Sequence, residues 1–200
     1  ASRGLGDVYK RQSANNASKT ALTWRKYLDE QYANGIWNTN ACPIVIRYAE
    51  VLLTYAEAVN ELSGPSADVY DKLDLIRGRV GMPKVDREKY ASKETLRRLI
   101  RRERGVELAG EGVRRADILR WKDDNGKMVA ETVLNGVLER VVGTVNYAET
   151  DPTKRAEIDT NAPATDKKIE DRVFKVHNRY NPIPQGAIDN NPNLEQNPGY

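Results

Sequence analysis

The stretch from Pro43 to Leu62, PIVIRYAEVLLTYAEAVNEL, decides the fold class of this chain. On a helical period of 3.6 residues its apolar side chains cover most of the circumference, and only a narrow polar strip is left. Such a helix needs packing neighbours on two or more sides, so we expect the central helix of an all-α layer, ended by Ser63-Gly64-Pro65. The expected apolar stripe is Tyr48, Leu52, Tyr55, Val59 and Leu62, beside Ala49, Leu53 and Ala56; the polar strip is Arg47, Glu50, Thr54, Glu57 and Glu61.

A second helix is predicted from Ser66 to Val80, with apolar residues on one face only. Ser66 is a suitable N-cap, and Gly81-Met82-Pro83 is a stop signal. Together the two helices form an antiparallel hairpin of about the size of one tetratricopeptide unit, near 34 residues. Solenoid repeats need about three units to be stable. Either further units lie outside this chain, or later helices close the core.

A third helix is predicted from Lys93 to Ala109, starting at Ser92, and it places Glu103 and Glu107 inside its apolar stripe. Buried carboxylates must be paired or must change their pKa. They are open to three interpretations: structural ion pairs, a metal site, or the acid and base of a glycoside hydrolase, whose carboxylates lie about 5 to 9.5 Å apart. We favour ion pairing, because arginines are abundant and a catalytic pair opens on a cleft. The expected network is Arg47, Glu103, Glu107, Arg114 and Asp117.

The remaining segments are less regular. A short helix is expected to end at Trp121, followed by a short β-hairpin around Val137 to Tyr147 and a soft linker from Thr150 to Asp166. Ala1 to Gln12 has no apolar period and joins poorly to the segment after it, so we interpret it as a non-native leader. Residues 13–200 then form one domain.

The composition limits the classes of partner. Apolar residues make up 39% and charged residues 30%, with a net charge of +3, which is too small to indicate a polyanion. Lys93 to Lys122 is rich in arginine, but acidic residues are interleaved, so we expect a solvated face that includes Arg97, Arg101 and Arg104 rather than a nucleic-acid site. With one histidine and one cysteine, a zinc site is not expected. We expect no cofactor.

The aromatic residues suggest one candidate ligand site. The chain has ten Tyr and three Trp against one Phe, and rings with a polar group suit sites that stack on sugars and hydrogen-bond their hydroxyls. The densest group outside the predicted helices lies in a segment of ambiguous structure. An alternative stays open, in which these rings dock the segment onto the central helix. The group is Trp24, Tyr27, Tyr32 and Trp37, with Asn34, Asn38 and Asn40.

Four motifs together resemble the C-terminal part of SusD/RagB proteins, in the order in which that family has them. They are PIVIRYAEVLLTYAEAVNE, LDLIRGRVGMP, IRRERGVELAGEGVRRADILRW and PIPQGAIDNNPNLEQNPGY. The resemblance implies a mainly α-helical fold with tetratricopeptide-like helices. It also implies a lipid-anchored, surface-exposed nutrient-binding protein of the Bacteroidetes outer membrane, which passes glycans, or sometimes peptides, to a TonB-dependent SusC-like transporter without catalysis.

The chain also departs from that family. Its members are considerably longer, and their signal peptide, lipidated cysteine and most tetratricopeptide-like helices are absent here, so we interpret the chain as a fragment. Cys42 does not match the lipidated cysteine, because no apolar stretch precedes it. We expect a glycan-binding module. The alternatives are a scaffold without ligand contacts of its own and a glycoside hydrolase that uses Glu103 and Glu107.

Overall fold

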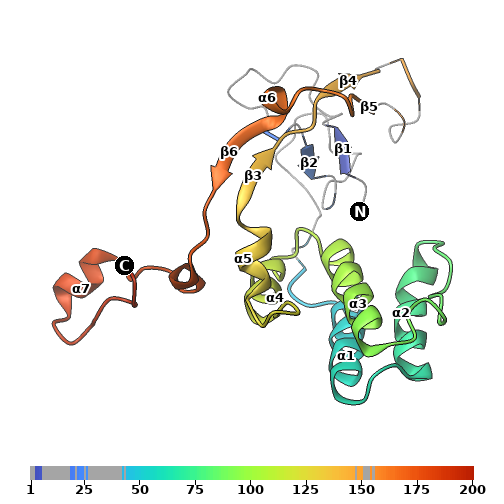
Figure 1. Cartoon of the computed structure of the whole chain (residues 1–200), viewed down its shortest axis with the longest axis horizontal. Helices are drawn as coiled ribbons and strands as arrows, with labels where there is room; N and C mark the ends of the chain where they lie inside the picture. The colour runs from blue at the N-terminus through green and yellow to red at the C-terminus, as the bar shows by residue number, and fades with distance from the viewer. Residues whose placement is uncertain are drawn as a thin grey trace. The chain divides into compact units, whose positions relative to one another are not determined.

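The structure is a computed structural model of the whole chain. It describes residues 3–5, 19–20, 22–24, 26, 42, 44–146, 148–150, 154 and 156–200. The chain divides into two compact units, Ala1–Arg3 with Trp24–Arg114 and Gly4–Thr23 with Arg115–Tyr200. Each unit has a hydrophobic cluster of its own. The expected mainly α-helical fold class is confirmed (Figure 1).

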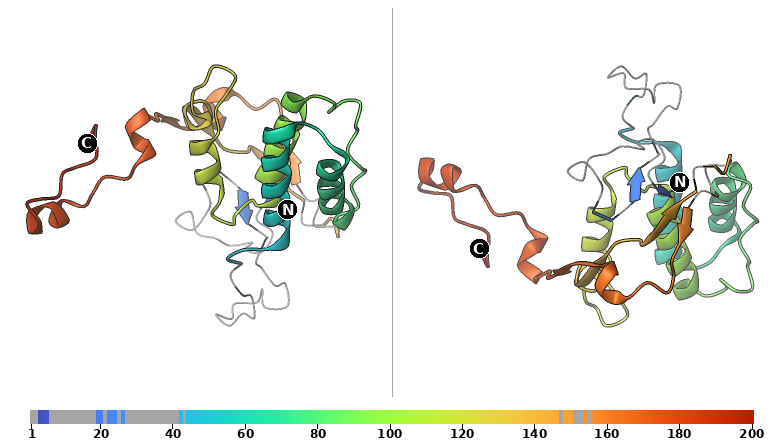
Figure 2. Two further views of the ribbon diagram at one scale, coloured as in Figure 1. Left: turned by 90° about the horizontal axis from the view of Figure 1, so that it is seen from below. Right: turned by 90° about the horizontal axis from the view of Figure 1, so that it is seen from above.

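The first unit is built from three helices, α1 (Tyr48–Ser63), α2 (Ala67–Arg79) and α3 (Lys93–Glu107). Helix α1 contacts both α2 and α3, as the views in Figures 1 and 2 agree, so it has the two neighbours that its sequence requires. The buried apolar core draws on all three helices, the segment between α2 and α3 and the residue that follows α3. It comprises Leu52, Leu53, Ala56, Val69, Tyr70, Leu73, Ile76, Val85, Leu96, Leu99, Ile100 and Leu108.

The helix ends follow the capping residues in the sequence. Gly64 ends α1 with a φ of 80° and a ψ of −165°, a conformation that glycine adopts without strain, and the Ser66 side chain accepts a hydrogen bond from the Val69 N–H at the start of α2. At α3, the Ser92 hydroxyl accepts from the Thr95 N–H while the Thr95 hydroxyl accepts from the Ser92 N–H, both at 3.2 Å. This reciprocal capping box fixes the first turn of the helix.

Replacing Ser92 with alanine is therefore expected to lower the free energy of unfolding by about 1 kcal/mol, because an amide of the first turn of α3 loses its acceptor. Urea unfolding monitored by far-ultraviolet circular dichroism measures the change. Ser63→Ala is the control, since Ser63 is exposed at the last position of α1. Equal losses in the two variants would contradict the capping role.

The predicted apolar stripe of α1 is partly wrong. Tyr48, Tyr55 and Leu62 are exposed, with 71%, 44% and 85% of their surface accessible. The face that α2 and α3 cover is rotated by about one position from the expected stripe. Its buried residues are Leu52, Leu53, Ala56, Glu57 and Asn60.

The predicted solvent strip of α3 is also wrong. Arg104 is buried, and its guanidinium donates to the Thr54 hydroxyl of α1 at 3.0 Å. Arg97 donates to both carboxylate oxygens of Glu61, at 2.5 and 2.6 Å. These hydrogen bonds hold the pKa of the Glu61 carboxyl below its usual value, in spite of partial burial. The polar strips of α1 and α3 thus face each other, and the basic residues are used inside the fold.

The second unit combines short helices with short antiparallel strand pairs. Helix α4 (Arg114–Arg120) begins at the boundary of the two units, and β1 (Arg3–Leu5) pairs with β2 (Leu22–Trp24). The other elements are α5 (Val129–Val133), β3 (Gly136–Glu139), β4 (Gly143–Val145), β5 (Ala156–Ile158), α6 (Ala164–Lys167), β6 (Lys168–Arg172), the 3-10 helix η2 (Val176–Arg179) and α7 (Gln185–Asn190).

The predicted hairpin from Val137 to Tyr147 is wrong, because its two strands do not pair with each other. Val137 of β3 lies opposite Asp171 of β6, and Thr144 of β4 lies opposite Glu157 of β5. Gly143, which would be the natural turn residue of a local hairpin, instead allows two backbones to approach closely. A Cβ at this position would lie 2.3 Å from the Glu157 carbonyl oxygen.

Candidate functional site

A cluster of charged side chains lies at the C-terminal end of α3, within the first unit. Arg47 donates from Nη1 to Glu107 Oε1 at 2.6 Å, and from Nε to both oxygens of Glu111 at 2.9 and 2.7 Å. Lys26 forms an ion pair with Glu111 Oε1. Arg79 of α2 also pairs with Glu107 Oε1, at 2.8 Å. Two carboxylates are therefore shared among three cations.

The local sequence explains why Glu111 points into this cluster. Gly110 and Gly112 have φ values of 79° and 81°, and only glycine adopts this left-handed conformation without strain. The Glu111 N–H donates to the Leu108 carbonyl at 3.1 Å, which folds the segment back under the helix end. Burial acts to raise the pKa of the Glu111 carboxyl, but hydrogen bonds from Arg47 and Lys26 outweigh it, and the pKa lies below its usual value.

The five residues of the expected ion-pair network do not form a single cluster. Arg47 and Glu107 meet, whereas Glu103 forms its ion pair with Arg77 of α2. The Arg114 guanidinium lies over α3, since a Cβ added at Gly105 would be 3.3 Å from it. Asp117, in the second unit, is buried and pairs with Arg120 at 3.0 Å.

Three members of the cluster, Lys26, Arg79 and Glu111, lie outside the ion-pair network expected from the sequence. Arg79 is the last residue of α2, and cations are favoured at the C-terminal end of a helix. That position was the one sequence signal for a charged contact by Arg79. Nothing in the sequence links Lys26 to residues 107–111.

The arrangement favours stabilisation over acid–base chemistry. A general acid at neutral pH needs a raised pKa, and a general base needs a lone pair that faces substrate. Here Glu103 and Glu107 are each engaged by arginine, and the pKa of Glu111 is lowered. Among the described residues, no group of three or more His, Cys, Asp and Glu side chains is arranged to hold a metal ion.

The predicted aromatic site lies mostly outside the described residues. Trp24 is described only as the last backbone position of β2. The other candidates, Tyr27, Tyr32 and Trp37 with Asn34, Asn38 and Asn40, are not among the residues that the structure describes. The aromatic site therefore stays a prediction.

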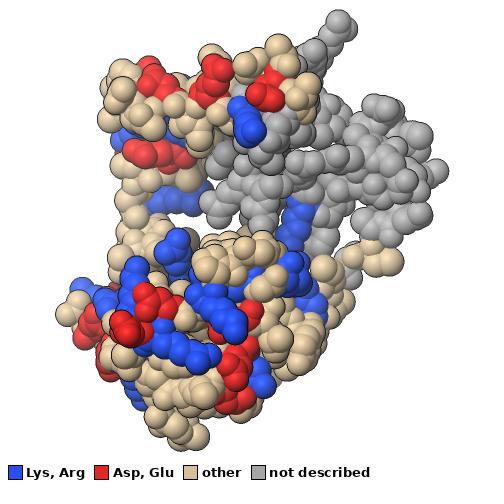
Figure 3. Space-filling model, turned by 90° about the vertical axis from the view of Figure 1, so that its right-hand side faces the viewer, with Lys and Arg blue, Asp and Glu red and all other residues tan. Residues whose placement is uncertain are grey.

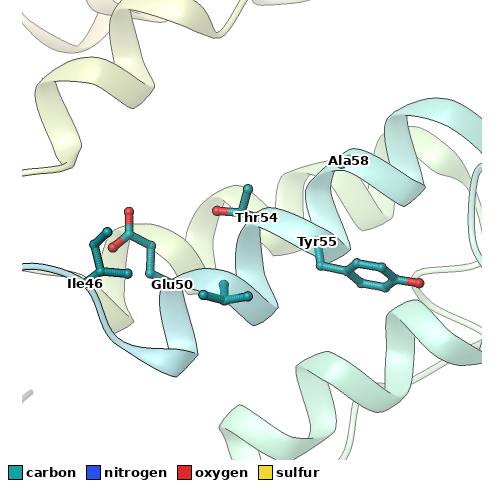
Figure 4. A pocket seen from close by; sticks show the side chains of 6 residues that line it. Ile46, Glu50, Thr54, Tyr55 and Ala58 are labelled. Carbon is teal, nitrogen blue, oxygen red and sulfur yellow. The ribbon is translucent and has the colours of Figure 1, made fainter.

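A shallow groove of about 400 Å³ follows the outer side of α1 (Figure 4). Ile46, Val51 and Ala58 give it an apolar floor, and Tyr55 lies at one end with its hydroxyl hydrogen-bonded to Asp68 at 2.5 Å. That bond raises the pKa of the Tyr55 hydroxyl. Because its polar group already has a partner, Tyr55 offers mainly its ring to the groove.

The charges on the surface are mixed in sign. On the face in Figure 3, Lys and Arg side chains alternate with Asp and Glu over the described part, without a wide region of one sign. A nucleic-acid interface concentrates basic residues on one face. In the described part of the chain, every helix is too short or too polar to pass through a lipid bilayer.

Comparison with known proteins assigns the family. The SusD family model matches residues 2–200. The SusD-like proteins P25 and P2 of Formosa agariphila are 40% identical over 79 residues and 38% identical over 93 residues, which is 39% and 44% of this chain. A SusD-like protein from Bacteroides fragilis has a similar crystal structure, with a TM-score of 0.58, 28% identity and coverage of 79% of this chain.

The chain belongs to the SusD family, as its four motifs implied. Members of this family generally bind nutrients such as glycans and are not enzymes. The chain spans 15% and 18% of the lengths of the two Formosa relatives and 26% of the Bacteroides fragilis protein.

Proposed function

We propose that this chain is part of a protein that binds an extracellular glycan or similar nutrient and delivers it to a TonB-dependent SusC-like transporter. In this proposal the whole protein is held at the surface of the outer membrane by a lipid anchor outside this chain. It performs no catalysis. The observation that carries the proposal is the match to the SusD family over residues 2–200. The engagement of Glu103 and Glu107 by arginines supports the binding role over the hydrolase alternative.

A polysaccharide panel tests binding against hydrolysis. The purified chain is expected to bind at least one glycan by isothermal titration calorimetry and to release no reducing ends from any of them. Release that Glu103→Gln abolishes would overturn the non-enzymatic proposal. The scaffold alternative predicts that this chain gives no heat with any glycan, whereas the full-length protein binds.

For the ligand contacts we propose the predicted aromatic group, Trp24, Tyr27, Tyr32, Trp37 and Asn38. Loss of an aromatic ring that stacks on a sugar removes apolar contact without removing core packing. Trp37→Ala and Trp24→Ala are therefore expected to weaken glycan affinity roughly tenfold or more, with an unchanged melting temperature. Tyr48→Ala is the control, because Tyr48 is an exposed ring on α1. A lower melting temperature with intact affinity would assign the two tryptophans to the core.

A further inference from the structure

The groove on the outer side of α1 brings an aromatic ring and two polar side chains together. Glu50, Thr54 and Tyr55 line it above an apolar floor that includes Val51 and Ala58. Figure 4 shows the Tyr55 hydroxyl pointing away from Glu50 and Thr54, so that these two residues and the Tyr55 ring occupy different parts of the groove. Glu50 and Thr54 are about one helical turn apart, roughly 6 Å along the axis, a distance that a single sugar ring can span.

The Tyr55 ring is exposed and held in place at the same time. Its accessible fraction is 44%, and its hydroxyl donates to Asp68 of α2 at 2.5 Å. Lys72 Nζ lies 5.7 Å from the ring centroid and pairs with the same Asp68 carboxylate at 3.1 Å. A side chain that is ordered before binding loses little freedom when a ligand stacks on it. The ring is thus a pre-organised surface for the apolar C–H face of a sugar.

The Glu50 carboxylate has unused capacity to accept hydrogen bonds. Its ion pair with Arg104 of α3 is 3.9 Å long, which is beyond hydrogen-bonding distance. Among the described residues this carboxylate accepts no hydrogen bond, although only 22% of its side chain is exposed. A partly shielded carboxylate requires donors, and two neighbouring hydroxyls of a sugar supply them.

Thr54 offers the complementary group. Its hydroxyl oxygen accepts from Arg104 Nη1 at 3.0 Å, and its hydroxyl hydrogen can still donate to an oxygen of a ligand. Arg104 is buried, with 6% of its surface accessible, and it contacts both polar residues of the groove from beneath. The groove therefore presents one acceptor group and one donor group beside a fixed ring.

The charges decide the class of ligand. Among the described residues that line the groove, Glu50 is the one charged side chain, and Arg104 offsets its charge. An acidic sugar would bring a second carboxylate beside Glu50 with no lining cation to compensate for it. A wholly apolar ligand would leave Glu50 and Thr54 without partners. A neutral sugar, with hydroxyls on its edge and C–H groups on its face, satisfies all three side chains.

We propose that this groove binds a neutral sugar residue of a nutrient glycan. The sugar stacks on Tyr55, donates hydroxyl hydrogens to Glu50 and accepts a hydrogen bond from Thr54. The site is separate from the predicted aromatic group, and the inference rests on the proposed function, whose ligand class it narrows.

Calorimetry on the whole 200-residue chain tests the stacking role. The probes are soluble neutral oligosaccharides of glucose, xylose, mannose or galactose, with oligogalacturonate as the acidic counterpart. At least one neutral probe is expected to bind, and Tyr55→Ala is expected to weaken its binding about tenfold or more, whereas Tyr55→Phe keeps the ring and most of the affinity. Tyr48→Ala is the matched control, because Tyr48 is an exposed ring of α1 that does not line the groove. Equal effects of Tyr55→Ala and Tyr48→Ala would overturn the inference.

Glu50→Gln tests the carboxylate with the same neutral probe. It keeps the shape of the side chain but removes the charge, and charge-assisted hydrogen bonds are about twice as strong as neutral ones. Affinity is expected to fall about tenfold, with an unchanged melting temperature by circular dichroism. Glu94→Gln, at an exposed carboxylate in the first turn of α3, is the control and is expected to leave affinity unchanged. Unchanged affinity in Glu50→Gln would count against the site.

The remaining outcomes separate this inference from the proposed function. If neutral probes bind and Tyr55→Ala leaves their affinity unchanged, the proposed function stands and the inference fails. If oligogalacturonate binds and Tyr55→Ala weakens it, the neutral class is wrong. If the chain binds no probe, the inference fails, and the full-length protein then tests the proposed function. Self-association in sedimentation equilibrium that Tyr55→Ala abolishes would assign the groove to contacts between copies of the chain, against the inference.

Discussion

Replacing Leu53 with alanine is expected to lower the free energy of unfolding of the first unit by about 3 kcal/mol. Leu53 has no accessible surface and belongs to the cluster in which α1, α2 and α3 meet. Truncation removes three buried carbon atoms and leaves a cavity in a close-packed core, which relaxes only in part. Urea unfolding at two wavelengths, one sensitive to helix and one to tyrosine, measures the loss.

Leu62→Ala is the matched control, because it makes the same chemical change on the same helix at a position that is 85% exposed. It is expected to change stability by less than about 0.5 kcal/mol. A loss as large as that of Leu53→Ala would mean that Leu62 is covered in solution, against the exposure in this structure.

This contrast shows what the sequence of α1 could and could not predict. The distribution of apolar residues correctly indicated a helix with at least two neighbours, and the caps at Ser66 and Ser92 gave the starts of α2 and α3. Periodicity could not show which side of α1 each neighbour covers. A helix that is apolar on most sides has several equivalent stripes, and the one through Tyr48 and Leu62 was the wrong choice.

The position of the arginines of α3 was missed for a different reason. A row of arginines on one face of an amphipathic helix is usually predicted to face solvent, because a buried guanidinium needs an acceptor. Here that condition is met by the opposite helix, since Glu61 and Thr54 lie where Arg97 and Arg104 need acceptors. The polar strip of α1 was visible in the sequence, but the pairing of two polar strips depends on the tertiary arrangement.

The charged cluster around Glu111 shows the same limit for the candidate site. Gly110 and Gly112 are helix-breaking residues on either side of Glu111, yet the cations that bind the Glu111 carboxylate come from positions 26 and 47. Ion pairs between side chains so distant in sequence depend on the tertiary fold, which places residues 26 and 47 beside the end of α3. The period of any one helix does not contain that information.

The second large effect is expected at Glu103. Its carboxylate and the Arg77 guanidinium pair with only 13% and 14% of their side chains exposed, and Arg77 also donates to the Pro83 carbonyl at 2.7 Å. Glu103→Ala leaves a shielded arginine without its anion. Complete burial would make such a loss about 3 to 5 kcal/mol, and partial access of water to this pair reduces our expectation to about 2 kcal/mol.

The double variant Glu103→Leu/Arg77→Met distinguishes a stranded charge from lost packing. If the loss in Glu103→Ala comes from the unpaired guanidinium, replacing both partners with apolar side chains of similar size should recover at least half of it. Glu107→Ala gives a further comparison: Arg47 keeps Glu111 as a partner and Arg79 is largely exposed, so we expect a loss of only about 1 kcal/mol. A double variant no more stable than Glu103→Ala would contradict the stranded-charge explanation, because the pair would then contribute mainly through the shape of its side chains.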